Sequence, residues 1–257
     1  MQPGQPTELT FDLMGSAITL DAGHRIRITI TGADAHNFAL YPDPTGGDAP
    51  IIDLVLRQLR HASIREVVIS VGHLAELIMA YCGDGSRYDL SITYVREHEP
   101  LGTIGPLGLL PAFDETCLVI NGDVLTDLDY GALQRFHRER KAVATVACYQ
   151  RPVKVDKGVV AIDQDGLITE WLEKPTYHYP VAMGLYVLEP SVLRVLPPGK
   201  QFDAPDLIRH LMQEGERVQA FEFDGYWLDI GVPADYDLAL TDVEKVMSRV
   251  LHKQQGE

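Results

Sequence analysis

From residue 50 onward, short apolar stretches alternate with segments in which apolar residues recur at helical spacing. The helical segments cover 50–62, 74–82 and 130–141, and the extended segments cover 66–71, 91–95, 116–120 and 142–148. Because the extended segments are too short for core helices, we predict strands there. Strands that alternate with helices predict a mainly parallel sheet covered on both faces.

The pattern changes after about residue 149. Residues 158–162 and 167–173 flank Asp165-Gly166, a dipeptide that is typical of a tight β-hairpin. Further strands are predicted at 183–188 and 218–223, and a last helix at 233–250. We therefore expect antiparallel strands and helices added to the parallel sheet.

The first 49 residues differ from both of these parts. Polar and apolar side chains alternate over 8–13, 16–20 and 25–31. In residues 25–31 the alternation of polar and apolar side chains predicts a strand with one solvent-exposed face and one buried face. The stretch 32–47 is rich in Gly, Pro and Asp, which predicts a loop.

The charge balance and the apolar runs exclude several classes of protein. The chain has 22 Lys and Arg against 37 Asp and Glu, a formal net charge of −15, whereas nucleic-acid and anionic-membrane binders need a basic face. No apolar run approaches the roughly 20 residues of a membrane helix, and residues 1–6 lack the features of a secretion signal. Three widely spaced cysteines indicate reduced core residues. We expect a cytoplasmic protein with no nucleic-acid or membrane partner.

Two acidic motifs at strand ends are the first candidates for chemistry. Asn121-Gly122-Asp123 follows the strand 116–120, at the edge where open α/β sheets bind ligands. Asp229 lies between large apolar residues, where a carboxylate is costly to bury without a cation or a donor. Two such carboxylates suit magnesium-assisted phosphoryl or nucleotidyl transfer. The alternatives are a helix N-cap for Asp123 and a hydrogen-bonded turn for Asp229.

Two further motifs carry weaker signals. In Glu173-Lys174-Pro175, lysine suits a phosphate and glutamate suits sugar hydroxyls, although a surface ion pair is the alternative. Residues 101–105, Leu-Gly-Thr-Ile-Gly, form a glycine-flanked helix start whose N–H groups are suited to an anion or a sugar hydroxyl. The nine histidines show no zinc-ligand spacing.

Taken in order, these motifs resemble the sugar-1-phosphate nucleotidyltransferases, the family of hexose-1-phosphate guanylyl-, uridylyl- and thymidylyltransferases. The resemblance runs from Pro50 to about Val243. The segments that carry it are 50–52, 81–85, 99–105, 121–123, 158–160, 173–175, 183–186 and 227–231.

The resemblance implies an α/β fold of the Rossmann-like, GT-A-like nucleotidyltransferase type, a mixed sheet with added antiparallel β elements. It implies that a nucleoside triphosphate and a sugar 1-phosphate give a nucleoside diphosphate sugar and pyrophosphate. Asp123 and Asp229 would then be Mg²⁺ ligands, and Glu173 and Lys174 would hold the sugar and its phosphate. The other implied substrate-binding residues are Gly102 and Thr103 near the base or ribose, Asn121, and Gly158 and Gly184 at the sugar.

The chain departs from this family near its N-terminus. The family has a Gly-Gly-x-Gly-Thr-Arg loop that wraps the triphosphate, followed by Pro-Lys-Pro, and neither is present here. The nearest alignments keep Arg27 as the catalytic cation and place Asp43 where the lysine belongs. Exchanging attraction for repulsion at about 4 Å from a phosphate costs on the order of 8 kcal/mol before screening. We therefore expect weak or altered nucleotidyl transfer.

The N-terminal segments 8–13, 22–30 and 32–38 are similar instead to the C-terminal β-sandwich of CocE/NonD-type hydrolases. We expect a fusion in which residues 1–48 are a hydrolase-derived β segment, 49–243 a nucleotidyltransferase-like domain, and 244–257 a helix end and tail. The strand at 25–31 is expected to replace the missing central strand of the sheet. A paired N-terminal hairpin is also compatible with a homodimer interface.

Two alternatives stand beside a nucleotidyltransferase that acts on sugar phosphates. One is a catalytically silent relative that binds a sugar nucleotide or a partner subunit. The other is a repurposed enzyme that uses the retained sugar pocket. The expected small-molecule partners are a sugar phosphate with a nucleoside triphosphate, or a sugar nucleotide.

Overall fold

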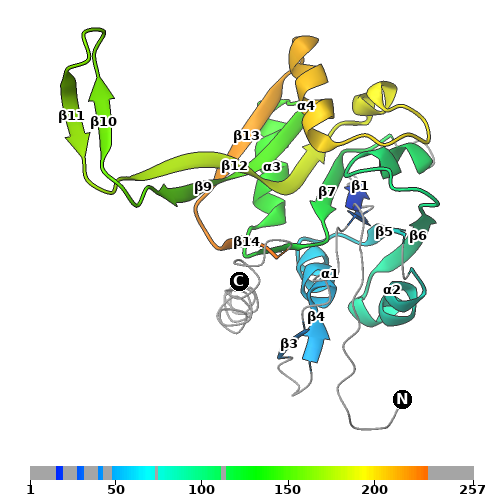
Figure 1. Cartoon of the computed structure of the whole chain (residues 1–257). Helices are drawn as coiled ribbons and strands as arrows, with labels where there is room; N and C mark the ends of the chain where they lie inside the picture. The colour runs from blue at the N-terminus through cyan, green and yellow to red at the C-terminus, as the bar shows by residue number, and fades with distance from the viewer. Residues whose placement is uncertain are drawn as a thin grey trace.

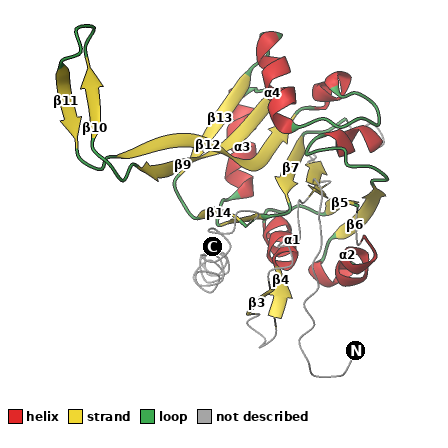
Figure 2. Cartoon of the chain, in the orientation of Figure 1, coloured by secondary structure: helices red, strands yellow, loops and turns green. Residues whose placement is uncertain are grey.

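The computed structural model describes residues 16–19, 28–31, 40–42, 48–72, 75–110 and 114–230. Its α-helices are α1 (Ile51–His61), α2 (Ala75–Cys82), α3 (Tyr130–Arg140) and α4 (Ala204–Gln213). Short 3₁₀ helices are η1 (Ser86–Tyr88), η2 (Gly105–Leu109) and η3 (Pro190–Val195). Figure 1 and Figure 2 show these helices around a central sheet, from which a two-stranded arm projects.

The central sheet has eight strands in the order β13-β9-β12-β7-β2-β1-β5-β6. The strands are β1 (Ser16–Thr19), β2 (Ile28–Thr31), β5 (Glu66–Val71), β6 (Ser91–Arg96), β7 (Cys117–Asn121), β9 (Ala144–Lys154), β12 (Thr176–Leu188) and β13 (Val218–Phe223). The pairs β2–β7, β5–β6 and β13–β9 are parallel. Because β12 is antiparallel to β7 and β9, and β1 to β2, β5 and β7, the sheet is mixed.

Three two-stranded ladders accompany this sheet. They are β10 (Val159–Ile162) with β11 (Ile168–Leu172), β8 (Val124–Thr126) with β14 (Trp227–Asp229), and β3 (Leu40–Pro42) with β4 (Asp48–Pro50). The first is the hairpin predicted around Asp165-Gly166, and Figure 1 shows it at the tip of the arm. The third corrects the prediction of a loop over 32–47. Gly, Pro and Asp favour turns, but they do not exclude a short ladder beside a turn.

Strand β7 is buried on both faces and separates two hydrophobic cores. Leu118 and Ile120 belong to the core that α1, α2 and α3 cover, whereas Cys117 and Val119 belong to the core that α4 covers. All four side chains are fully buried. This alternation follows from the period of two along a strand, and β7 is an interior strand of the sheet.

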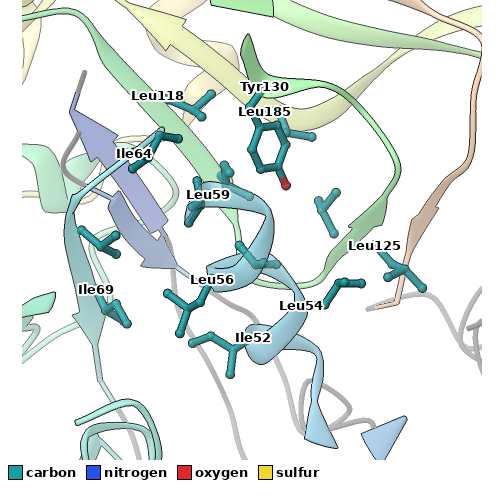
Figure 3. Close-up of a cluster of buried hydrophobic side chains, with 14 of the residues drawn as sticks. Ile52, Leu54, Leu56, Leu59, Ile64, Ile69, Leu118, Leu125, Tyr130 and Leu185 are labelled. Carbon is teal, nitrogen blue, oxygen red and sulfur yellow. The ribbon is translucent and has the colours of Figure 1, made fainter. Parts of the chain in front are cut away.

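Helix α1 packs its apolar face against the first core. Leu54, Leu56 and Leu59 are buried, and Figure 3 shows them in one cluster with side chains of the sheet and Tyr130 of α3. Burying one such leucine contributes roughly 1.5–3 kcal/mol. Asp53 in the first turn and Arg60 in the last turn complement the helix dipole.

The sequence-predicted elements between residues 50 and 223 are found close to their expected positions, and β9 and β12 extend further than predicted. Residues 28–31 of the predicted strand 25–31 lie in the sheet beside β7. The strand predicted at 8–13 and the helix predicted at 233–250 fall outside the described residues. The domain boundaries at 48 and 243 stay predictions. No described helix is both long and apolar enough to cross a membrane.

Candidate functional site

The turn that follows β7 brings the two acidic motifs together. Asn121 ends β7, and Gly122 and Asp123 lead directly into β8. The alternative prediction, that Asp123 caps a helix, is therefore wrong. In the β8–β14 ladder Asp229 pairs with Val124, and the N–H of Ile230 donates to the carbonyl oxygen of Asp123 at 3.0 Å. Asp123 and Asp229 thus occupy neighbouring positions on adjacent segments of chain.

Because Gly184 of β12 has no side chain, the Asn121 side chain fills the space beside it. Leu185 pairs with Ile120, which puts Gly184 beside Asn121. A Cβ added to Gly184 would lie 2.8 Å from Asn121 Nδ2, and its φ of +77° is strained for any other residue. Within the described chain, Asn121 Oδ1 is buried and has no hydrogen-bond partner. A buried acceptor without a donor is costly, which makes Asn121 Oδ1 a candidate to accept from a ligand.

Aromatic residues occur on three strands around this turn, Trp227 on β14, Tyr149 on β9 and Tyr186 on β12. The Trp227 indole donates to the carbonyl oxygen of Met183 at 3.1 Å, and its ring centroid is 5.4 Å from that of Tyr149. Burial raises the pKa of Tyr186 to about 12, with contributions from Cys148 and from the charge of Asp123. The sequence does not predict a role for Tyr149, because Tyr149 and Trp227 are far apart in sequence and meet only in the folded chain.

The donor set around the turn fits a Mg²⁺ ion held together with phosphate oxygens. Mg²⁺ is usually bound through one or two carboxylates, substrate phosphates and water. Asp123 is 9% exposed and Asp229 is partly buried. Among the residues with described placement, no group of three or more His, Cys, Asp or Glu side chains forms a protein-only cage.

Gly102 and Thr103 lie in a loop that contacts the N-terminal end of α4. The Thr103 N–H donates to Asp203 Oδ1 at 3.0 Å, and the Ala204 N–H donates to Thr103 Oγ1 at 2.8 Å. A Cβ on Gly102 would lie 2.4 Å from Asp203 Oδ1. The N–H groups of residues 104 and 105 donate to the carbonyl oxygen of residue 202. In this structure the loop therefore binds the N-terminus of α4, and its role toward a ligand stays a prediction.

Gly158, Glu173 and Lys174 lie together on the arm. A Cβ on Gly158 would meet the Trp171 ring at 2.6 Å, and the Trp171 indole donates to Glu173 Oε2 at 3.2 Å. Lys174 is exposed, with a φ of 45°. Thr176 and Gly184 are eight residue steps apart along β12, a span of roughly 26 Å in an extended strand. The structure thus groups these residues with one another and not with Asp123. Arg27 lies outside the described residues.

Two family models match different parts of the chain. Residues 44–246 match the model described as nucleotidyl transferase, which is more than half of the chain. The chain belongs to the nucleotidyl transferase family. Residues 1–50 match the X-Pro dipeptidyl-peptidase C-terminal non-catalytic domain, in agreement with the predicted similarity to a hydrolase β-sandwich.

Curated nucleotidyltransferases are similar over most of this chain. The UTP–glucose-1-phosphate uridylyltransferase of Synechocystis sp. is 33% identical over 214 residues, which are 76% of this chain and 55% of that protein. The mannose-1-phosphate guanyltransferase of Candida albicans is 30% identical over 199 residues, 74% of this chain and 55% of that protein. The chain spans about half the length of the curated relatives it matches.

Solved structures share the fold of this chain. A putative glucose-1-phosphate thymidylyltransferase from Bacillus anthracis superposes with a TM-score of 0.61 at 22% identity, covering 80% of this chain and 85% of that one. HddC from Yersinia pseudotuberculosis gives 0.60 at 22% identity, covering 81% and 90%. The predicted α/β nucleotidyltransferase fold, a mixed sheet with added antiparallel strands, is confirmed.

Proposed function

We propose that this nucleotidyl transferase family member joins a nucleoside triphosphate and a sugar 1-phosphate at the carboxyl end of β7. The observation that carries the proposal is the β8–β14 ladder, which holds Asp123 and Asp229 at neighbouring positions beside Asn121. The relatives support the substrate class, because they are named for transfer to glucose 1-phosphate and mannose 1-phosphate.

In the reaction, a phosphate oxygen of the sugar bonds to the α-phosphorus of the triphosphate, and the bond from that phosphorus to the β-phosphate oxygen breaks. Asp123 and Asp229 would hold Mg²⁺, which when bound offsets negative charge on the phosphate oxygens as pyrophosphate leaves. Asn121 Oδ1 would accept a hydrogen bond from a substrate hydroxyl. Glu173 and Lys174 lie on the arm, away from Asp123 along β12, so their predicted contact with the sugar and its phosphate has no part in this step.

The transfer is proposed to be weak or altered, because the sequence lacks the family's triphosphate loop. A loss of even about 4 kcal/mol of phosphate binding in the transition state slows a reaction roughly a thousandfold. The same absence favours a second candidate function, in which the chain binds a nucleotide or sugar nucleotide without turning it over.

Pyrophosphate release measured with Mg²⁺, each nucleoside triphosphate and a panel of sugar 1-phosphates tests the proposal. We expect release by the wild type and a decrease of about a hundredfold or more in Asp123→Asn and in Asp229→Asn. Asp165→Asn, in the exposed hairpin turn, is the matched control and should retain full activity. Release that persists in Asp229→Asn would contradict the proposal, and silence with nucleotide-dependent thermal stabilisation would favour the second candidate.

A further inference from the structure

A surface pocket of about 400 Å³ lies between the C-terminal end of α1 and η1. Its lining residues are Arg57, Arg60, His61, Arg87, Tyr88 and Asp89. Three arginines therefore line one pocket in a chain whose formal net charge is −15. A cationic concavity on an otherwise acidic protein attracts anions locally.

Two tyrosine rings hold the Arg87 guanidinium in place. It lies 4.2 Å from the centroid of the Tyr81 ring and 4.5 Å from that of Tyr88. Its Nη2 also donates to the Tyr88 hydroxyl. Since stacking and one hydrogen bond fix its plane, Arg87 loses little further freedom when it binds a ligand.

A buried aspartate beneath the pocket holds Arg57. Arg57 Nε donates to Asp53 Oδ2 at 2.6 Å, and the Tyr88 hydroxyl donates to Asp53 Oδ1 at 2.6 Å. The Asp53 side chain is only 5% exposed, so its oxygens face inward. Asp53 Oδ1 also lies 3.9 Å from Arg87 Nη2, so this carboxylate faces two of the three arginines.

At the rim, Arg60 pairs with an exposed partner. Its Nε donates to Asp89 Oδ2 at 2.7 Å, and its Nη2 donates to the same oxygen. Exposed ion pairs of this kind contribute little to stability, so a stronger anion can replace the carboxylate. Arg65 donates to the carbonyl oxygens of Arg60 and Ile64 and so covers the negative end of the α1 dipole.

The pocket and the candidate site lie at opposite ends of the parallel strands of the sheet. The end of α1 leads into β5, and η1 leads into β6, so the pocket is at the amino ends of these parallel strands. Because β1 is antiparallel to both β5 and β7, β5 and β7 are parallel to each other. Asn121 is at the carboxyl end of β7, which makes the two sites separate.

We propose that this pocket binds a phosphate-bearing anion through the guanidinium groups of Arg57, Arg60 and Arg87. A planar guanidinium matches phosphate oxygens in bidentate geometry. The volume falls within the roughly 300–1,000 Å³ that is typical of small-molecule sites. The proposal does not depend on the proposed catalytic function.

Titration calorimetry with inorganic pyrophosphate in EDTA tests this site without added metal. We expect saturable binding that becomes about tenfold weaker or more in Arg60→Gln/Arg87→Gln. The matched control, Arg135→Gln/Arg209→Gln, removes two exposed arginines that each pair with one carboxylate and should bind as the wild type does. Parallel titrations with inorganic phosphate and a nucleoside triphosphate distinguish recognition of phosphate groups alone from recognition of a nucleotide.

A second measurement locates the ligand even if the double variant folds poorly. Pyrophosphate is expected to protect Arg60 and Arg87 of the wild type from phenylglyoxal, mapped by peptide mass spectrometry, while Arg135 stays reactive. The proposal is overturned if none of the three anions binds or if neither arginine is protected. It is also overturned if binding keeps its wild-type affinity in Arg60→Gln/Arg87→Gln, because the anion would then bind elsewhere on the protein.

Discussion

Asn121 and Gly184 illustrate how a missing side chain shapes the candidate site. The Asn121 side chain occupies the space that a Cβ on Gly184 would need, and its Oδ1 stays buried without a donor from the described chain. The sequence motif predicts that these residues bind substrate, but it cannot predict this contact. The contact depends on the register of β12 against β7, which pairs residues far apart in sequence.

Substituting Gly184→Ala should lower both stability and activity. The new Cβ meets Asn121 Nδ2 at 2.8 Å on a backbone with positive φ, so we expect a loss of about 1–3 kcal/mol in the free energy of unfolding. Gly199→Ala is the matched control, because Gly199 also has positive φ but an open surrounding. Urea denaturation and pyrophosphate release check both variants, and equal effects of the two substitutions would contradict the role of the contact.

A buried histidine network makes stability depend on pH. His137 Nε2 donates to Glu189 Oε1 at 3.0 Å, and the Thr116 hydroxyl donates to the same oxygen at 2.9 Å. The His137 bond, more than the Thr116 bond, lowers the pKa of Glu189 below its ordinary value of 4.5. Its stabilising contribution is therefore present above pH 4.5 and is lost as pH falls through the folded pKa.

Thermal denaturation between pH 6 and pH 3 tests this contribution. The wild type should lose more stability below pH 4.5 than Glu189→Gln, which has no carboxylate to protonate. Glu139→Gln, an exposed change on α3, should follow the wild type. Parallel curves for wild type and Glu189→Gln would show that the network carries no pH dependence.

At the scale of elements, short apolar runs predict strand positions closely, both in buried β5 and β7 and in partly exposed β13. β5 and β13 have the predicted bounds, and β7 differs by one residue at each end. The outer half of β12 was missed, because residues 176–182 pair only with β9, are largely exposed and form no apolar run. Helix α4 was also missed, although Asp203, Pro205 and the apolar spacing of Leu207 and Leu211 are helix signals.

Thr103→Val should weaken the start of α4. The substitution keeps the branched shape but removes the hydroxyl that accepts from the Ala204 N–H at 2.8 Å. Loss of a capping acceptor costs about 1 kcal/mol, which urea denaturation measures. If Thr103 also binds substrate, the KM of the variant rises as well. A free energy of unfolding equal to that of the wild type would contradict the capping role.

At the scale of the whole molecule, a segment from the N-terminal part of the chain lies inside the sheet. β2 pairs in parallel with β7, and β1 lies between β2 and β5 in the strand order. β2 belongs to residues 1–50, which match a different family model from the rest of the chain. It lies next to β7, the strand that ends at the candidate site. The two parts of the sequence therefore share one sheet.

A proline in β2 tests that arrangement. Ile30 pairs with Ser16 and Ile120, so Ile30→Pro removes a ladder donor from an interior strand and should cost about 3 kcal/mol or more. Thr169→Pro in the projecting hairpin is the control, since it should disturb only that hairpin. Soluble yield and urea denaturation measure both, and a wild-type stability for Ile30→Pro would contradict the position of β2.

Mn²⁺ binding, followed by electron paramagnetic resonance with a nucleoside triphosphate present, is the most direct test of a cation shared by two carboxylates. The wild type should bind one ion, and Asp123→Asn and Asp229→Asn should each weaken binding about tenfold or more, while Asp165→Asn leaves it unchanged. Wild-type affinity in either of the first two variants would contradict the shared site.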